Sequence, residues 1–282
     1  AFRTAYEKAR DIASGILDKS IKNIASRIRF GSDGIPLVVF NSLSWQRTDI
    51  AYFTLDAEGN DMNSFGLVDE NGKEIPYQLT GNHKIKDNRD EVLTFLFVAE
   101  NVPPVGYKTY YLVKGKKQPW NAEYKTTGNK FENRFFRAEF TAGGLKSLYD
   151  KELGVNLLNT GKFLGAEIFT MKSVGNGAGE FTDVQQPTME GFEKLSSYGQ
   201  PWALISSGPV RDVYHFRKEI NHVTVDQEIV FYKTIKRIDV NISLLGFDGE
   251  RYREFRMVWP LNQQSAEVTY EVPMGVVRVG KD

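Results

Sequence analysis

Residues 210–233 of this 282-residue chain read VRDVYHFRKEINHVTVDQEIVFYK, and this stretch decides the fold class. Two runs rich in β-branched and aromatic residues, 210–220 and 223–233, meet at Asn221-His222. Such residues favour strands, because their side chains fit a pleated, half-buried surface. We therefore expect two long antiparallel strands here, joined by a tight turn, as part of a large β sandwich.

Further strands are predicted on both sides of this hairpin. Alternating or apolar runs that predict more strands of the sandwich lie at 131–140, 145–150, 235–245, 252–259 and 266–272. Nearer the N-terminus, Asn71-Gly72 is a strong hairpin signal. The runs around it, at 36–40, 49–55, 91–99 and 105–113, predict a separate and smaller β module.

The first 29 residues have a different period. Their apolar residues recur at steps of three and four and trace one stripe of a helix, formed by Ile12, Ile16, Leu17, Ile21, Ile24 and Ile28. The segment 31–34, which reads GSDG, ends the helix. Because one helix cannot bury its own stripe, we expect it to pack on β structure or on another copy of the chain.

The sequence thus predicts a mainly β fold in three parts. Residues 1–33 hold the helix. Residues 34–118 form a small β-sandwich-like module. Residues 119–282 form part of a large antiparallel sandwich.

The composition excludes several classes of function. The chain has no cysteine, which rules out disulfides, thiolate zinc sites, iron–sulfur clusters and cysteine nucleophiles. Lys plus Arg and Asp plus Glu both number 36, so the formal net charge is zero. We therefore expect neither nucleic acid nor a membrane as a partner, because binding to polyanionic surfaces needs a basic excess.

Few residues suggest metal or acid–base chemistry by their spacing. The three histidines are His83, His215 and His222, and no HExxH spacing occurs. His215 and His222 can face each other across the hairpin, but a metal would need at least a third ligand. Asp248 and Glu250 lie at a predicted turn, where such residues usually serve the turn itself.

Aromatic residues make up 13% of the chain, and most of them are expected in sandwich cores. Trp45 and Trp259 lie in or beside predicted strands and are assigned to the core. Trp202 borders an irregular stretch, 172–200, and long irregular loops are often functional. We expect Trp202 to stack on a sugar, since an indole offers an apolar face with a polar edge.

Several short motifs occur in a recognisable order. VFNSLSWQRTD at 39–49 resembles an FNPLSW-x-R opening of a small β domain, and VPPVGYKTY at 102–110 resembles the VPPLGY closing strand of that domain. NKFENRFFR at 129–137 and GLKSLYDKE at 144–152 resemble the entry to a large β sandwich. Together these motifs resemble glycoside hydrolase family 38 α-mannosidases over most of residues 38–275. The resemblance implies that the helix of residues 1–33 is the end of a helical middle domain, and that residues 119–282 are part of a large antiparallel supersandwich similar to galactose-mutarotase-like domains.

The resemblance implies a retaining, zinc-dependent enzyme that hydrolyses α-linked mannose. Nothing in this sequence resembles the family's zinc-binding and nucleophile motifs, and the chain begins at Ala1 rather than at Met. We therefore expect a fragment without catalytic residues or a cofactor of its own, inactive alone, with zinc in an absent catalytic domain. Its expected partners are that N-terminal catalytic domain and a mannose-containing oligosaccharide, whose binding site it borders.

The same resemblance suggests which residues contact the sugar. Gly165-Ala166-Glu167 is similar to a family segment that is often Gly-Ala-Tyr, whose tyrosine reaches toward the active site. A carboxylate accepts strong hydrogen bonds, so Glu167 is the predicted ligand of sugar hydroxyls. Tyr198 and Trp202 are expected to add stacking from the far end of the loop.

Two alternatives stay open. The chain could be a free-standing carbohydrate-binding or adhesion module, which would bind sugar without hydrolysing it. It could also be a mutarotase-like enzyme in its own right. That activity would need an acid–base pair in the sandwich, commonly His with Glu, so His215 or His222 would have to line a pocket.

Overall fold

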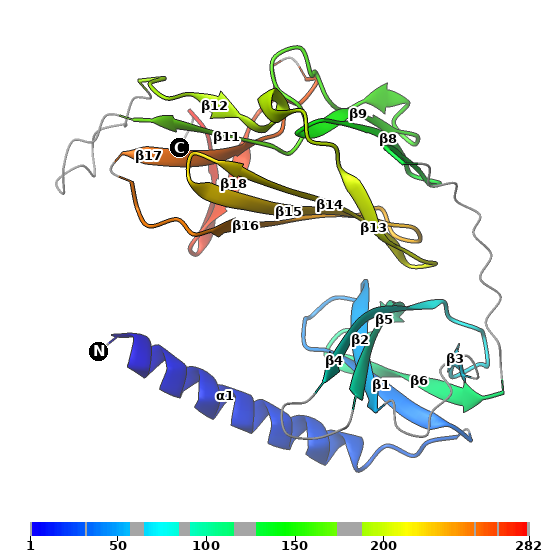
Figure 1. Ribbon diagram of the computed structural model, residues 1–282. Helices are drawn as coiled ribbons and strands as arrows, with labels where there is room; N and C mark the ends of the chain where they lie inside the picture. The colour runs from blue at the N-terminus through cyan, green and yellow to red at the C-terminus, as the bar shows by residue number, and fades with distance from the viewer. Residues whose placement is uncertain are drawn as a thin grey trace. The chain divides into compact units, whose positions relative to one another are not determined.

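The computed structural model describes residues 2–31, 33–56, 65–84, 91–115, 128–173, 188–250, 252–263 and 265–280. In these ranges the chain forms one α-helix and a set of antiparallel sheets (Figure 1), which confirms the predicted mainly β fold. The chain divides into two compact units, Ala1–Trp120 and Asn121–Asp282. No described helix combines the length and apolar character needed to cross a membrane. The predicted glycine-rich part of the irregular stretch, 174–187, lies outside the described residues.

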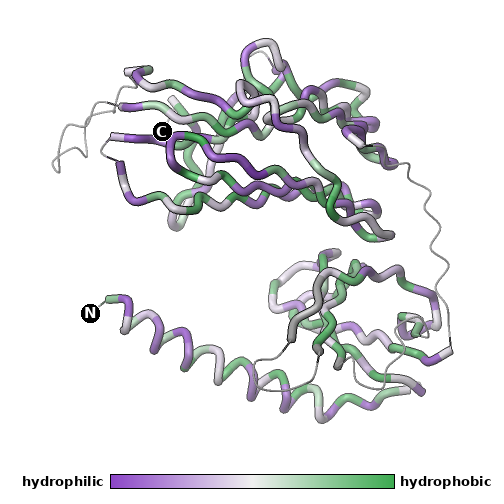
Figure 2. The backbone as a smooth tube through the Cα atoms, in the orientation of Figure 1, coloured by the Kyte–Doolittle hydropathy of each residue, from purple (hydrophilic) through white to green (hydrophobic). Residues whose placement is uncertain are grey.

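The N-terminal helix α1 spans Phe2–Ala25, a little less than the predicted 1–29. None of its residues is buried, and Ile16 and Ile24 are 62% and 46% exposed. Figure 2 shows polar and apolar residues interleaved along the helix, as expected for an amphipathic segment. The stripe therefore does not pack on the β structure of the first unit, which was one of its two expected partners.

The β part of the first unit is a sandwich of two three-stranded sheets. One sheet has the order β1-β6-β3, with β1 (Ile35–Asn41), β6 (Gly106–Lys114) and β3 (Phe65–Asp69). The other has the order β2-β5-β4, with β2 (Arg47–Asp56), β5 (Glu91–Val102) and β4 (Tyr77–Lys84). Phe97 of β5 meets Tyr110 of β6 edge to face, with ring centroids 4.8 Å apart. This contact joins the two sheets within one aromatic core.

A buried asparagine ties the ends of this sandwich together. The side-chain amide of Asn41 donates hydrogen bonds to the carbonyl oxygens of Trp45 (2.7 Å), Val102 (3.3 Å) and Pro103 (3.1 Å). Its Oδ1 accepts a hydrogen bond from the amide of Leu43 at 3.1 Å. The two motifs at 39–49 and 102–110 are therefore joined side by side through Asn41.

Trp45, in the first of these motifs, is 59% exposed, so the prediction of a core position for Trp45 is wrong.

The second unit contains three larger sheets and a separate hairpin. The first sheet has the order β10-β9-β8-β7, from β10 (Val155–Asn156), β9 (Gly144–Asp150), β8 (Phe136–Thr141) and β7 (Lys130–Glu132). The second has the order β12-β11-β17, from β12 (Glu193–Lys194), β11 (Glu167–Lys172) and β17 (Arg253–Val258). The third has the order β13-β14-β15-β16, from β13 (Ala203–Ser207), β14 (Arg211–Ile220), β15 (Val223–Tyr232) and β16 (Ile238–Leu245). The hairpin pairs β18 (Thr269–Val272) with β19 (Gly275–Arg278).

Stacked aromatic rings hold the first and third of these sheets face to face. Phe140 of β8 stacks on Tyr214 of β14 with ring centroids 4.3 Å apart. Phe131 of β7 stacks on Phe231 of β15 at the same distance. All four side chains are at most 1% exposed, and they lie in one core with residues of β11. The predicted sandwich core thus lies between these sheets.

The strand predicted over 131–140 is interrupted. The Oδ1 atom of buried Asn133 accepts hydrogen bonds from the amides of Phe135 (2.8 Å) and Phe136 (2.7 Å), which turns the chain between β7 and β8. The side-chain amide of Asn133 donates to the carbonyl oxygen of Tyr232 at 2.8 Å. A side chain that satisfies the backbone locally competes with a continuous strand, and here it divides the predicted strand in two.

The hairpin quoted first forms as predicted. Ile220 pairs with Val223, so Asn221 and His222 are the two residues of its loop. Their φ angles are 48° and 64°, the pattern of a type I′ turn, whose twist matches that of the flanking strands. Beyond β15 the chain continues through β16 and a loop into β17, which pairs with β11.

We predict that Asn41→Ala destabilises the first unit by about 2–4 kcal/mol. The change leaves several backbone groups without a partner, and each buried unsatisfied group costs ~1–3 kcal/mol. Hydrogen exchange at the amides of Leu67 and Phe97, which lie in the core of this unit, measures the loss. Asn23→Ala on exposed α1 is the control. Equal protection in both variants would contradict the role assigned to Asn41.

Candidate functional site

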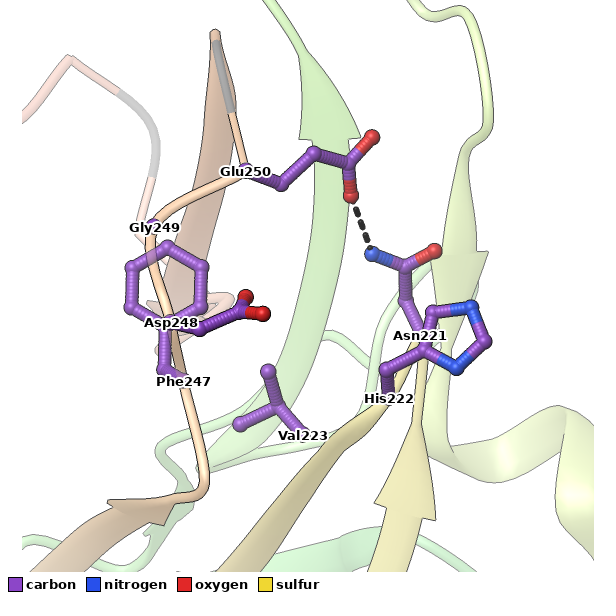
Figure 3. Close-up of a pocket in the computed structure, with 7 residues that line it drawn as sticks. All are labelled: Asn221, His222, Val223, Phe247, Asp248, Gly249 and Glu250. Carbon is purple, nitrogen blue, oxygen red and sulfur yellow. Dashed lines mark hydrogen bonds between the residues drawn. The ribbon is translucent and has the colours of Figure 1, made fainter.

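A cavity of about 370 Å³ lies beside the β14–β15 turn. It is lined by the turn residues Asn221 and His222, by Val223 at the start of β15, and by residues 247–250 of the loop that connects β16 to β17 (Figure 3). Its volume lies in the range of about 300–1,000 Å³ that is typical of small-molecule sites. The sequence marked both segments as turns, and the structure brings them to opposite sides of one cavity.

An arginine fixes the loop that forms one side of this cavity. Arg253, at the start of β17, has a side chain only 4% exposed. Its Nε and one terminal nitrogen donate to the two carboxylate oxygens of Glu250, at 3.0 and 3.2 Å. The other terminal nitrogen donates to the carbonyl oxygen of Gly191 at 2.9 Å. From the opposite side, the amide of Asn221 donates to Glu250 at 2.8 Å and so links the turn to the loop.

These contacts keep Glu250 in its charged form. The hydrogen bonds from Arg253, then that from Asn221, lower the pKa of Glu250 from 4.5 to about 2, and the charges of Arg253 and Lys172 add to the effect. Lys172 Nζ lies 4.0 Å from the carboxylate. Glu250 is therefore a structural anion at neutral pH, with its oxygens already bonded to the protein.

Two other polar side chains of the cavity, those of Asp248 and His222, have no such partners among the described residues. Across the described ranges, no residue forms a hydrogen bond or an ion pair with the Asp248 carboxylate or with the His222 ring. Figure 3 shows the Asp248 carboxylate projecting from the loop toward the turn. Phe247 is 43% exposed, and its ring meets Phe255 edge to face at 5.5 Å. Within the described residues, the cavity thus offers a carboxylate and an imidazole without partners, together with a partly supported aromatic ring.

His222 also occupies a costly backbone conformation. Its φ of 64° lies in the left-handed region, which disfavours residues with a Cβ atom by roughly 1–2 kcal/mol. Glycine is the residue usually found at the second position of a type I′ turn. Strained conformations of this kind cluster at functional sites, and Asn221 beside His222 shares the positive φ that the turn requires.

Glu167, the predicted sugar ligand, lies in the interior of the second unit. It is 0% exposed. Its Oε2 accepts a hydrogen bond from the amide of Leu164 at 2.8 Å, and its Oε1 accepts one from the amide of Ser196 at 2.9 Å. In this structure the carboxylate therefore offers no exposed atom to a sugar hydroxyl. It joins the segment before β11 to the short 3₁₀ helix η2 (Leu195–Tyr198).

Two glycines allow the close approach on which this junction depends. Gly143 has a φ of 86°, and a Cβ atom there would lie 2.3 Å from the amide nitrogen of Ser196. A Cβ atom on Gly144 would lie 2.7 Å from the carbonyl oxygen of Gly165. Only glycine permits the turn between β8 and β9 to contact η2 and the segment before β11 so closely.

The two aromatic residues predicted to stack on sugar differ in exposure. Trp202 is 6% exposed, and its ring contacts Phe140 and Phe216 with centroids 5.3 and 5.4 Å away, so it belongs to the core. Tyr198 is 37% exposed and donates a hydrogen bond from its hydroxyl to Glu193. Burial of the hydroxyl, followed by this bond to Glu193, raises the pKa of Tyr198 to about 12. Neither aromatic residue lines the cavity.

The two histidines of the hairpin have separate surroundings. His215 bonds through Nε2 to Asp226 at 3.0 Å, and Arg217 pairs with the other oxygen of Asp226 at 3.2 Å. His222 lines the cavity instead. No group of three His, Asp or Glu side chains in the described part of the chain is placed to hold a metal ion. Sequence reasoning did not identify Arg253 or Asn221 as part of the site. For Arg253 the sequence held one local signal, its position three residues after Glu250, and for Asn221 it held none.

The sequence matches the family model of the glycosyl hydrolases family 38 C-terminal domain over residues 131–282. This is more than half of the chain, so the chain belongs to that family.

Two solved structures share the fold of the chain. A glycosyl hydrolase family 38 protein from Enterococcus faecalis has a TM-score of 0.77 at 13% sequence identity, over 98% of this chain and 39% of that protein. An α-mannosidase from Enterococcus faecalis V583 has a TM-score of 0.73 at 14% identity, over 98% of this chain and 37% of that enzyme. The chain thus spans well under half the length of either protein. No curated protein matches it in sequence.

We predict that Glu167→Ala lowers the stability of the second unit by about 2–4 kcal/mol. Two backbone amides would lose their acceptor, at ~1–3 kcal/mol for each buried group. Urea unfolding monitored by hydrogen exchange at Tyr214 and Ile229, both in the core of this unit, measures the change. Glu219→Ala, an exposed carboxylate on β14, is the control. Unchanged stability would show that the two bonds contribute nothing.

We also predict that Arg253→Met raises the pKa of Glu250 from about 2 toward its ordinary value of 4.5, because the largest cause of the depression is removed. Carbon-13 NMR titration of the Glu250 carboxyl measures this. Asn221→Ala removes the second cause and should raise the pKa by less. Because the folded-state pKa is depressed, the stability that these contacts provide is present above pH 4.5 and is lost as the pH falls toward 2. An unchanged pKa in Arg253→Met would refute the assignment.

Proposed function

We propose that this chain is the non-catalytic β region of a zinc-dependent, retaining α-mannosidase. The family match over residues 131–282 is the observation that carries the proposal. It is supported by the fold likeness across 98% of the chain to a solved α-mannosidase. Because shared fold alone does not define function, the specific activity is our inference from the family.

In this proposal the catalytic chemistry belongs to another domain. The described residues do not supply a set of three metal ligands, so they do not fit a zinc site. We therefore place the zinc, the nucleophile and the general acid–base outside this chain. The β region would support that catalytic domain by packing against it, and the exposed stripe of α1 is an apolar surface suited to such packing.

We further propose that η2 and the residues around it border the sugar site. Tyr198 presents a partly exposed ring there, and Lys218 Nζ lies 5.3 Å from the ring centroid. Glu167 would act on this border through the bond that holds Ser196. Trp202 would support the same region from the core, where it contacts Phe140. In this proposal Tyr198 contacts the sugar directly, whereas Glu167 and Trp202 hold the residues around it in place.

The activity can be tested on the longer protein in which we propose that the chain occurs. That protein should release the aryl group from an aryl α-mannoside, lose activity with a zinc chelator, and recover it when zinc is added. Proton NMR should show the α-anomer of mannose as the first product. The isolated 282-residue chain should show no hydrolysis above the uncatalysed rate.

Two results would overturn this proposal. Hydrolysis by the isolated chain would show that the catalytic groups lie within it. A longer protein that binds mannosides without hydrolysing them would favour the alternative, a free-standing carbohydrate-binding or adhesion module.

A further inference from the structure

We infer that the cavity between the β14–β15 turn and the β16–β17 loop binds one pyranose ring of a neutral oligosaccharide, through Asp248, His222 and the ring of Phe247. The class of sugar, a mannoside, rests on the proposed function. The location of the site rests on the geometry of the cavity alone. The test can therefore use this chain without any catalytic domain.

The charges around the cavity restrict the ligand. Arg253 and Lys172 offset the charge of Glu250, so among the described lining residues it is the carboxylate of Asp248 that would repel a phosphate, a sulfate or an acidic sugar. A metal ion is disfavoured because the described residues provide no group of three suitable ligands. A neutral ligand that donates hydrogen bonds fits both facts. Sugar hydroxyls are such donors, and an ionised carboxylate forms the stronger bonds with them.

The apolar part of the cavity also fits a sugar ring. Phe247 and Val223 line it, and the contact with Phe255 holds the Phe247 ring on one edge while 43% of the residue stays exposed. A pyranose has an apolar C–H face together with hydroxyls at its rim, so one ring can cover Phe247 and still bond to Asp248. Small-molecule sites commonly combine apolar lining with a few fixed polar groups in this way.

The two carboxylates of the loop have different roles. Arg253 and Asn221 donate hydrogen bonds to the carboxylate oxygens of Glu250, and these bonds fix the loop in place. Asp248, two residues earlier, forms no hydrogen bond or ion pair with the described residues, so they leave its oxygens to a ligand. Holding a ligand group in place before binding reduces the entropy lost on binding. The strained His222 is held in the same way, by the turn between two long strands.

The test is titration of the isolated 282-residue chain with methyl α-mannoside and with α-linked mannobiose, followed by amide shifts in ¹⁵N NMR. We expect saturable shifts confined to residues 221–223 and 247–250. Asp248→Asn keeps the side-chain shape and should weaken binding at least tenfold. Phe247→Leu, which removes the aromatic face, should weaken it by a similar factor. Glu219→Gln, an exposed carboxylate on β14 outside the cavity lining, should bind like the wild type.

His222→Gly separates a binding role from a structural one. Glycine suits the left-handed position, so this variant should unfold at a higher temperature than the wild type. It should nonetheless bind the mannoside several-fold more weakly, because the imidazole is lost. A purely structural histidine would show the higher stability with unchanged affinity, and that result would remove it from the site.

The inference is overturned if the wild-type chain shows no saturable shifts, or if the shifts lie away from the cavity. It is also overturned if Asp248→Asn and Phe247→Leu bind normally while folded. None of these results would bear on hydrolysis by the longer protein. Conversely, a longer protein without α-mannosidase activity would refute the proposed function and leave a positive binding result in place.

Discussion

The second unit depends on the stacking of aromatic rings between two of its sheets. Phe140 stacks on Tyr214 and also meets Phe231 edge to face, so one ring of β8 contacts both β14 and β15. Alternate residues of those strands point into the core, and a shift of one residue would turn Tyr214 out to solvent. The ring contacts therefore fix the register of the hairpin. That register places Asn221-His222 at the turn, and so places one side of the cavity.

Buried polar side chains are a second source of stability, because they bond to the backbone where strands end and the chain turns. Asn41 and Asn133 bond to backbone groups of segments that are distant in sequence. The buried Asp150 accepts hydrogen bonds from the amides of Glu152 and Leu153, and Lys236 pairs with it at 2.8 Å. Glu167 does the same between two loops. Because a buried backbone group without a partner is costly, each of these side chains specifies where a strand ends and where the chain turns.

The sequence predicted those features of the fold that depend on local pattern. The period of apolar residues gave the helix, the long strands and the two-residue turn, because burial of one face imposes that period. It failed where a single polar side chain competes with the pattern, as Asn133 does within the strand predicted over 131–140. It also assigned Trp45 to the core, whereas the structure leaves this residue 59% exposed. Trp202, expected at a sugar site, is 6% exposed, since burial depends on what packs over a residue rather than on its neighbours in sequence.

The cavity could be predicted only in pieces. The sequence predicts a turn at His222 and another at Asp248 and Glu250. Nothing local indicates that these two turns, 26 residues apart, face each other. Nor does the sequence distinguish the two carboxylates. Arg253 makes that distinction by bonding to both oxygens of Glu250. The assignment of one carboxylate to structure and the other to ligand therefore depends on the position of a third side chain.

Glu167 shows how one interior side chain can position a surface residue in a fold that tolerates low sequence identity. A fold shared at 13–14% identity depends on the apolar pattern and on turns with satisfied backbone groups more than on particular residues. The two oxygens of the Glu167 carboxylate diverge and accept hydrogen bonds from the amides of Leu164 and Ser196 at once. The segment 165–167 is consequently tied to η2, so the position of Tyr198 depends on an interior carboxylate.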